Sequence, residues 1–117
     1  MRRTILIVDD HAAYRRSARA LLEVDGFEVV GEAADGRSAI IQVARLRPQI
    51  VLLDIQLPDM DGFAVAVLLA EKPDPPAVVL TSTRDARSYR RRLTSSPALG
   101  FVPKSEVSGA VLVRLVA

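Results

Sequence analysis

The sequence predicts an α/β fold in which helices cover both faces of a parallel, doubly wound β-sheet. Five short, nearly continuous apolar runs rich in β-branched residues recur at regular intervals, which is typical of strands buried on both faces. The segments between them have helical character, and strands that alternate with helices indicate a parallel sheet with right-handed crossovers. The expected strands contain residues 5–8, 29–30, 50–53, 78–80 and 101–102.

The first helix is expected from Tyr14, because apolar or small side chains recur there at helical spacing. They occupy positions 14, 17, 18, 21 and 22, and this stripe leaves Arg15, Arg16 and Arg19 on the opposite side. Asp25-Gly26 supplies the signal that ends the helix.

The later helices follow the same pattern with different end signals. Residues 37–46 form the second helix, since Pro48 prevents its continuation. Residues 63–71 form the third, which ends before a proline-rich linker at residues 73–76. The fourth, over residues 85–94, carries four arginines, and the fifth, over residues 107–117, has only Ser108 and Arg114 as polar side chains.

Five strand–helix units account for residues 1–117, which we interpret as one domain. The expected strand order is 2-1-3-4-5, the flavodoxin-like arrangement. Pro103 supports the last place in that order, because a proline cannot donate to a strand ladder and is therefore favoured at an edge.

Composition excludes several classes of function. The chain has no cysteine and one histidine, which excludes disulfides, thiolate metal sites and multi-histidine metal centres. No apolar run is long enough to span a membrane or to form a signal-peptide core, so a cytoplasmic protein is expected. The net charge is +2, and the dense run Arg90-Arg91-Arg92 has no nucleic-acid-binding motif beside it. We interpret this run as a solvated helix face and expect no direct contact with nucleic acid.

Chemically active residues follow four of the five predicted strands. Because the carboxyl ends of parallel strands meet at one edge of the sheet, these residues are expected to converge there. Taken singly, each has an ordinary explanation as a turn, cap or surface residue. Their combined placement predicts a site formed by Asp9-Asp10, Asp54, Thr81-Ser82 and Lys104.

Carboxylates crowded at one edge repel each other, and a divalent cation with oxygen ligands relieves that repulsion. Mg²⁺ is the usual choice where a phosphate is handled. Asp54 then has the place of a nucleophile, with Lys104 and the Thr81 hydroxyl as donors to a phosphoryl group.

The same segments resemble the receiver domains of two-component response regulators, over essentially the whole chain from Ile5 onwards. As a set, these motifs are highly specific. They are Ile5-Leu6-Ile7-Val8-Asp9-Asp10-His11, Val51-Leu52-Leu53-Asp54, Leu57-Pro58-Asp59-Met60-Asp61-Gly62, Val78-Val79-Leu80-Thr81-Ser82 and Gly100-Phe101-Val102-Pro103-Lys104.

The resemblance implies a role for each residue of the site. Asp54 would be the phosphoacceptor, and Asp10 would bind Mg²⁺ directly while Asp9 binds it mostly through water. The backbone carbonyl of Gln56 would complete the metal's protein ligands. The switch residues would be Thr81, which turns towards the phosphoryl group, and Phe101, which swings inward, while Lys104 pairs with the phosphate.

The resemblance also implies a signalling role. A sensor histidine kinase would supply the phosphoryl group, and the surface of helix four, strand five and helix five would change. That surface would bind an effector or a second copy of the chain. Independently of the resemblance, the apolar residues of the fifth helix suggest an exposed patch for binding or dimerisation, and the alternative is that small apolar side chains are simply tolerated at the surface. The chain would not be an enzyme beyond self-catalysed phosphotransfer and dephosphorylation. It would act alone or as the N-terminal receiver of a longer DNA-binding transcriptional regulator.

Three departures from the family pattern stand out. Many members have a cis-proline directly after the lysine, whereas Pro103 precedes Lys104 here, which leaves the peptide isomer open. Residues 95–99 replace the more usual Gly-Ala turn before strand five, which predicts an unusual shape for the signalling face. Phe101 lacks the hydroxyl of a tyrosine.

Two enzyme classes fit less well. A phosphatase of the haloacid-dehalogenase type also uses an aspartate after a strand, but it needs a second aspartate two positions on, where this chain has Gln56. A flavin or dinucleotide site would need a glycine-rich loop after the first strand, and Asp9-Asp10 stands there instead. A receiver that has lost phosphorylation is also disfavoured, because every chemical position is filled.

Overall fold

The computed structural model describes residues 2–117 and contains one five-stranded parallel sheet in the order β2-β1-β3-β4-β5. This confirms the predicted fold class and strand order, and it confirms that the strand with Pro103 lies at an edge. The strands are β1 (Thr4–Val8), β2 (Glu28–Ala33), β3 (Ile50–Asp54), β4 (Ala77–Ser82) and β5 (Gly100–Pro103).

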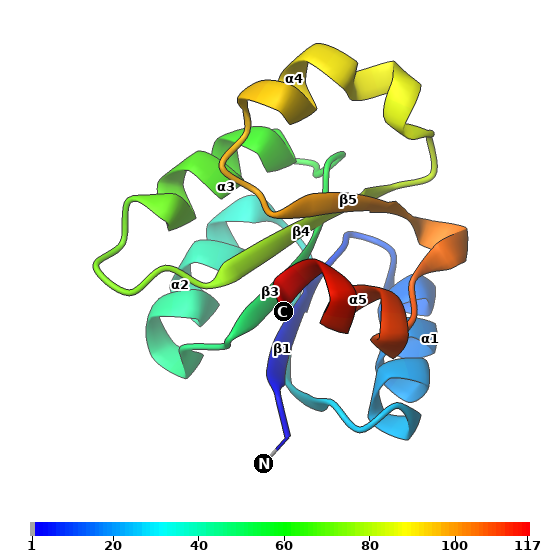
Figure 1. Cartoon of the computed structure of the whole chain (residues 1–117). Helices are drawn as coiled ribbons and strands as arrows, with labels where there is room; N and C mark the ends of the chain where they lie inside the picture. Colours follow the sequence, from blue (N-terminus) through cyan, green and yellow to red (C-terminus); the bar gives the residue numbers. More distant parts are fainter. Residues whose placement is uncertain (1) are drawn as a thin grey trace.

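Helices cover both faces of the sheet (Figure 1). Helices α1 and α5 pack on one face, and α2, α3 and α4 lie on the other. Successive side chains of a strand point to opposite faces, so Ile5 and Ile7 enter the core under α1 and α5, while Leu6 and Val8 enter the other. The helices are α1 (Ala12–Val24), α2 (Gly36–Leu46), α3 (Gly62–Ala70), α4 (Arg90–Ser95) and α5 (Gly109–Val116).

Helix α1 differs from its prediction in the face that it buries. Ala18 and Leu22 are buried as expected, whereas Leu21 is 42% exposed. Arg15 and Arg19, predicted to face solvent, turn towards β2, where both bind the Glu32 carboxylate. The buried face of α1 is therefore narrower than the apolar stripe in the sequence predicted. Part of the contact with the sheet is made instead by the ion pairs of Arg15 and Arg19 with Glu32.

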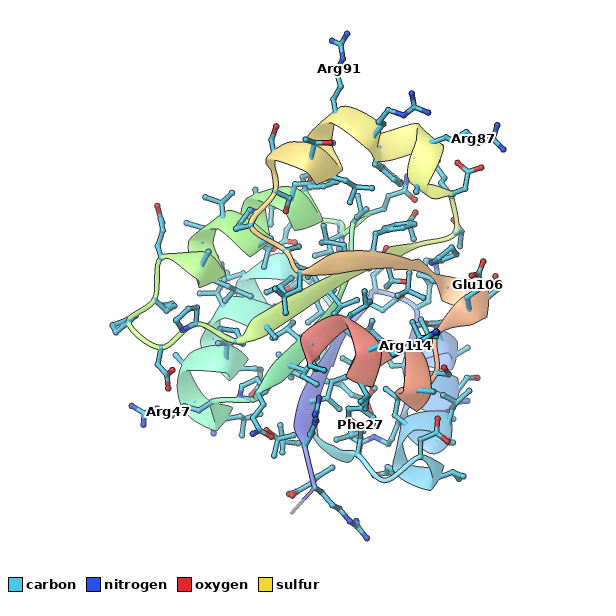
Figure 2. The ribbon with its side chains drawn as sticks, viewed as in Figure 1. Phe27, Arg47, Arg87, Arg91, Glu106 and Arg114 are labelled. Atoms are coloured by element: carbon cyan, nitrogen blue, oxygen red, sulfur yellow. The ribbon has the colours of Figure 1, made fainter. Side chains whose placement is uncertain are left out.

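The predicted fourth helix is divided in the structure. A 3₁₀-helix covers Ala86–Tyr89, and the α-helix α4 begins only at Arg90. Tyr89 has φ −125° and ψ 14°, outside the helical region, and its side chain is buried. Burial of this ring explains the break, and the arginines Arg87 and Arg91 extend outward into solvent (Figure 2).

The ends of the other helices lie within two residues of their predicted bounds, and α5 begins at Gly109 instead of residue 107. Asp25 caps α1 and is followed by Gly26 in a left-handed conformation with φ 94°. Peptide bonds within residues 2–117 are all trans, which settles the open question at Pro103. In the same part of the chain, no helix has both the length and the apolar character needed to cross a membrane.

Candidate functional site

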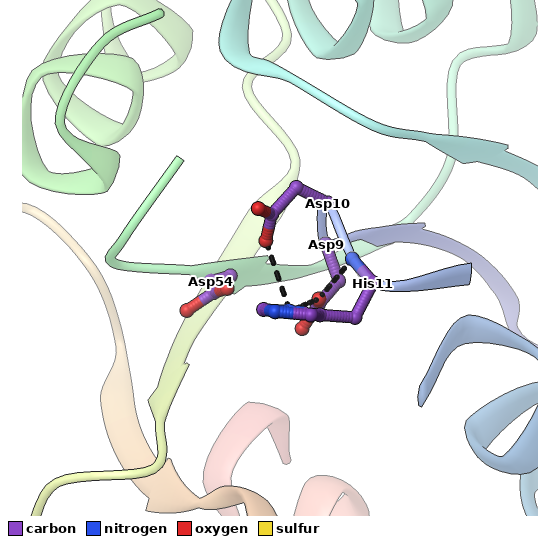
Figure 3. A group of neighbouring side chains, drawn as sticks. All are labelled: Asp9, Asp10, His11 and Asp54. Atoms are coloured by element: carbon purple, nitrogen blue, oxygen red, sulfur yellow. Dashed lines mark hydrogen bonds and ion pairs between the residues drawn. The ribbon is translucent and has the colours of Figure 1, made fainter. Parts of the chain in front are cut away.

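The carboxyl ends of β1 and β3 bring three carboxylates and a histidine together. Asp9, Asp10 and His11 follow β1, and Asp54 ends β3 (Figure 3). One ligand atom from each of these four side chains lies within 4.8 Å of the others. Asp9 and Asp54 are buried, whereas Asp10 is exposed. The site thus has a buried floor and an accessible rim.

Lys104 reaches the same carboxylates from the other side. Its ammonium lies 2.5 Å from Oδ2 of Asp9 and 3.2 Å from Oδ2 of Asp54. The convergence that the strand ends predicted is therefore present for Asp9, Asp10, Asp54 and Lys104.

The electrostatics of the site follow from this arrangement. Burial raises the pKa of Asp54, the Asp9 carboxylate raises it further, and Lys104 opposes both effects. Burial alone would lower the pKa of Lys104, but the two carboxylates outweigh it and raise that pKa. The lysine is thus held in its charged form, and it partly compensates two negative charges that have little access to water.

The loop after β3 fixes the position of Asp54. The Gln56 amide donates a hydrogen bond of 3.2 Å to Oδ1 of Asp54. Gly62 packs directly against the Asp54 carbonyl and the Ile55 Cα, so any side chain at this position would collide with backbone. Its amide donates to the Ile55 carbonyl at 2.8 Å. The glycine of the Asp61-Gly62 motif is therefore required by close backbone approach.

Asp59 anchors this loop to the neighbouring helix. Its carboxylate accepts hydrogen bonds from the Gly36 and Arg37 amides, at 2.8 and 2.9 Å, at the start of α2. These bonds lower the pKa of Asp59. A carboxylate at a helix N-terminus satisfies amides that lack intrahelical partners. Asp59 thus holds the loop and lies outside the acidic cluster.

Arg15 holds the loop that carries Asp9. Its guanidinium donates to the Asp9 carbonyl at 2.6 Å and to Glu32 at 3.0 Å. Arg19 binds the other Glu32 oxygen at 2.7 Å. Burial alone would raise the pKa of Glu32, but the hydrogen bonds from both arginines outweigh it and lower that pKa.

Thr81 and Phe101, the expected switch residues, stand on the neighbouring strands β4 and β5, and Phe101 contacts an aromatic side chain, Tyr89, that the sequence did not indicate. Thr81 pairs with Asp54 across β3 and β4, is buried, and has no hydrogen-bond partner for its hydroxyl among residues 2–117. Phe101 is partly exposed and stacks against Tyr89, with ring centroids 6.0 Å apart. The Tyr89 hydroxyl is 3.0 Å from Oγ of Ser82.

Sequence reasoning missed two further residues of the site. His11 places Nδ1 at 3.1 Å from Oδ1 of Asp9 and 3.0 Å from Oδ1 of Asp10. The ring of Tyr14 has the Lys104 ammonium 4.8 Å from its centroid. Burial and the Asp9 carboxylate raise the pKa of Tyr14 to about 12. The sequence did hold a sign of this role for Tyr14, because the residue carries a hydroxyl on an otherwise apolar helix stripe and lies four residues after Asp10.

The donor set suits a hard divalent cation. Mg²⁺ prefers oxygen ligands, and three carboxylates within 4.8 Å of one another supply them beside one accessible edge. The three side chains carry more negative charge than Lys104 compensates, which favours a cation. The fourth predicted ligand is the backbone carbonyl of Gln56. The amide of this residue donates a hydrogen bond to Asp54, and its side chain is exposed.

Comparisons with known proteins agree with this geometry. The sequence matches the family model described as response regulator receiver domain over residues 5–116. It is 42% identical over 112 residues to protein-glutamate methylesterase/protein-glutamine glutaminase 6 of Anaeromyxobacter dehalogenans. This match covers 94% of the chain described here and 31% of that protein. It is 31% identical over 122 residues to the transcriptional regulatory protein YdfI of Bacillus subtilis, which covers 94% of this chain and 57% of that protein.

The solved structures include a similar chain, the REC domain of AraT, a response regulator from Geobacillus stearothermophilus. It has a TM-score of 0.80 and 26% identity, and the match covers 99% of this chain and 91% of that one. The chain described here therefore spans less than two thirds of both curated relatives and nearly the full length of a separately solved domain.

Proposed function

Because the chain belongs to the family of response regulator receiver domains, we propose that it accepts a phosphoryl group on Asp54 and uses it to switch conformation. One observation carries this proposal: Lys104 contacts both Asp9 and Asp54, beside the accessible carboxylate of Asp10. A nucleophile, an acidic metal-binding pair and a fixed cation are the parts that phosphoryl transfer needs.

The reaction is a simple displacement. An Asp54 oxygen attacks phosphorus, the P–N bond of a phosphohistidine on a sensor histidine kinase breaks, and the freed imidazole takes a proton from water. The product is an aspartyl phosphate, which water later hydrolyses. Lys104 stays near Asp54 throughout and pairs with the phosphoryl oxygens.

Receiver domains generally bind Mg²⁺ at an acidic pocket, and Asp9, Asp10 and Asp54 would hold it here with the Gln56 carbonyl. When bound, it offsets negative charge on the transferred group. The chain's own residues orient the nucleophile: the Gln56 amide fixes one Asp54 oxygen, and Lys104 fixes the other.

Phosphorylation adds a charge of about −1.5 to −2 and three strong acceptors. Thr81 would turn its free hydroxyl towards them, and Phe101 would move into the space that is released. Such a change requires about 5.5 kcal/mol of differential stabilisation to convert a mostly inactive population to a mostly active one. The affected surface comprises α4, β5 and α5, through which the chain would contact an effector or a second copy.

A second reading concerns the whole protein. The chain covers 57% of a transcriptional regulatory protein and 31% of a methylesterase, so both relatives extend well beyond the matched region. We infer a cytoplasmic protein in which this domain either acts by contact or is the N-terminal receiver of a longer DNA-binding regulator. The receiver itself would contact neither membrane nor nucleic acid, and it would catalyse only its own phosphorylation and dephosphorylation.

The test uses acetyl phosphate and Mg²⁺, with intact mass as the readout. Wild type should gain one phosphoryl group, and Asp54→Asn should gain none. Asp74→Asn, in the loop before β4 at the opposite end of the sheet, is the matched control and should label like wild type. Labelling of Asp54→Asn at the wild-type level would overturn the proposal.

A further inference from the structure

Two buried hydroxyl groups near Asp54 lack hydrogen bonds. Within the part of the chain that the structure describes, the hydroxyls of Tyr14 and Thr81 have no partner. Most buried polar groups in proteins are paired, and each unpaired one costs free energy. Two unpaired hydroxyls at the same site therefore indicate that their partners arrive in another state of the protein.

The two hydroxyls are neighbours. The Thr81 hydroxyl opposes the rise in the pKa of Tyr14, which places the two groups near each other, yet neither hydroxyl meets the geometry of a hydrogen bond. Tyr14 enters from the first turn of α1, and Thr81 enters from the end of β4. Asp54 is the register partner of Thr81 in the sheet, and its charge contributes to the raised pKa of Tyr14, so both side chains are neighbours of Asp54. A small movement of either side chain would bring them together.

The ring of Tyr14 is already fixed by its surroundings. The Lys104 ammonium lies 4.8 Å from the ring centroid, a cation–π contact with a group that also binds Asp9 and Asp54. The Tyr14 ring therefore contacts the same lysine that would bind a phosphoryl group. Its hydroxyl remains free for another partner.

We propose that Tyr14 is a positioning residue that donates a hydrogen bond to Thr81 when the phosphoryl group is bound. A threonine hydroxyl has one hydrogen and two lone pairs. Once Thr81 gives its hydrogen to a phosphoryl oxygen, its lone pairs need a donor, and the unpaired Tyr14 hydroxyl supplies one. The resulting series of hydrogen bonds leads from Tyr14 through Thr81 to the phosphoryl oxygen, and each hydrogen bond in such a series strengthens the next.

This inference rests on the proposed phosphoryl site, and beryllofluoride with Mg²⁺ tests the two separately. Tyr14→Phe keeps the ring beside Lys104 and removes only the hydroxyl. We expect it to weaken beryllofluoride binding about five-fold, the value of one neutral hydrogen bond. In a Thr81→Val background, Tyr14→Phe should cause no further weakening, because the acceptor is already absent. Ser17→Ala, an exposed hydroxyl on the next turn of α1, is the matched control and should bind normally.

Urea unfolding without beryllofluoride supplies a readout that a purely structural role would not reproduce. Tyr14→Phe should be as stable as wild type or more stable, because it removes an unpaired buried hydroxyl. Equal binding by Tyr14→Phe and wild type would overturn the inference and leave the proposed function intact. Equal weakening in both Thr81 backgrounds would also overturn it. Failure of wild type to bind beryllofluoride would overturn the proposed function and, with it, this inference.

Discussion

The Lys104 ammonium lies 3.2 Å from Oδ2 of Asp54, a residue fifty positions away in the sequence. This contact joins β3 to the segment directly after β5, although β4 lies between the two strands in the sheet. It exists because both residues stand at carboxyl ends of parallel strands and because Lys104 is long enough to cross β4. At the carboxyl end of the sheet, the Lys104 ammonium thus contacts two buried carboxylates, those of Asp9 and Asp54.

Replacement of Lys104 by methionine should destabilise the protein in the absence of divalent cations. The variant leaves Asp9 and Asp54 buried with no compensating charge, which should lower the free energy of unfolding by about 2 kcal/mol. Added Mg²⁺ should recover part of the loss, because it neutralises the same carboxylates. Urea unfolding with and without Mg²⁺ measures both values. A loss that Mg²⁺ does not alter would contradict the assigned metal site.

Gly62→Ala should be more destabilising than another glycine-to-alanine substitution in this chain. The added Cβ would meet the Asp54 carbonyl and the Ile55 backbone, which cannot yield without moving Asp54. We expect a loss of about 1–3 kcal/mol. Gly31→Ala is the matched control, since its Cβ would meet mainly the end of the Leu46 side chain, which is 38% exposed. Equal unfolding midpoints for the two variants would argue against the close approach at Gly62.

Glu32 makes part of the stability depend on pH. The folded state lowers the pKa of Glu32 below its ordinary value near 4.5, so the unfolded state binds its proton first on acidification. Its stabilising contribution is complete above that ordinary value and is lost as the pH falls through the lowered pKa. Glu32→Gln should therefore differ most from wild type near neutral pH, and the difference should shrink in acid. A difference in the free energy of unfolding that grows on acidification, measured by urea unfolding, would show that the folded state raises the pKa of Glu32 instead of lowering it.

Arg92 links α4 to the loop that positions Asp54. Its guanidinium lies 2.5 Å from Oδ2 of Asp61 and 4.3 Å from the centroid of the Phe63 ring. Both side chains of the pair are partly exposed, so Arg92→Ala should cost only about 0.5–1 kcal/mol, and less in high salt. Arg91→Ala, which removes an outward-pointing neighbour (Figure 2), should have almost no effect. Equal effects of the two substitutions would exclude a specific role for Arg92.

The number and order of the strands could be predicted from the sequence, because apolar runs with clear helical segments between them mark each strand. The full extent of β2 could not, because only Val29 and Val30 form such a run within Glu28–Ala33. Burial on both faces leaves β3 with a fully buried run, and a pattern of that kind has few alternatives. The same logic located Asp54 and Lys104, since both stand at the carboxyl end of a strand. Strand ends are where backbone geometry alone determines the position of a side chain.

The contacts made by helix side chains were harder to predict. Arg15 and Arg19 were predicted to face solvent. They bind Glu32 on β2, a tertiary contact that the helix sequence alone does not indicate. Tyr89 interrupts the fourth helix because its ring packs between those of Phe63 and Phe101, a tertiary contact with no local signal. Tyr14 was predicted to belong to the apolar stripe, and no local pattern in the sequence indicates that its hydroxyl is buried without a partner.

The most direct test is to identify the residue that carries the phosphoryl group. Borohydride reduction converts an aspartyl phosphate to homoserine, and peptide mass mapping then locates the change after treatment with acetyl phosphate. With Mg²⁺ present, we expect homoserine at position 54 and unchanged Asp9, Asp10, Asp59 and Asp61. Reduction at any of these other aspartates, or equal labelling after removal of Mg²⁺, would contradict this expectation.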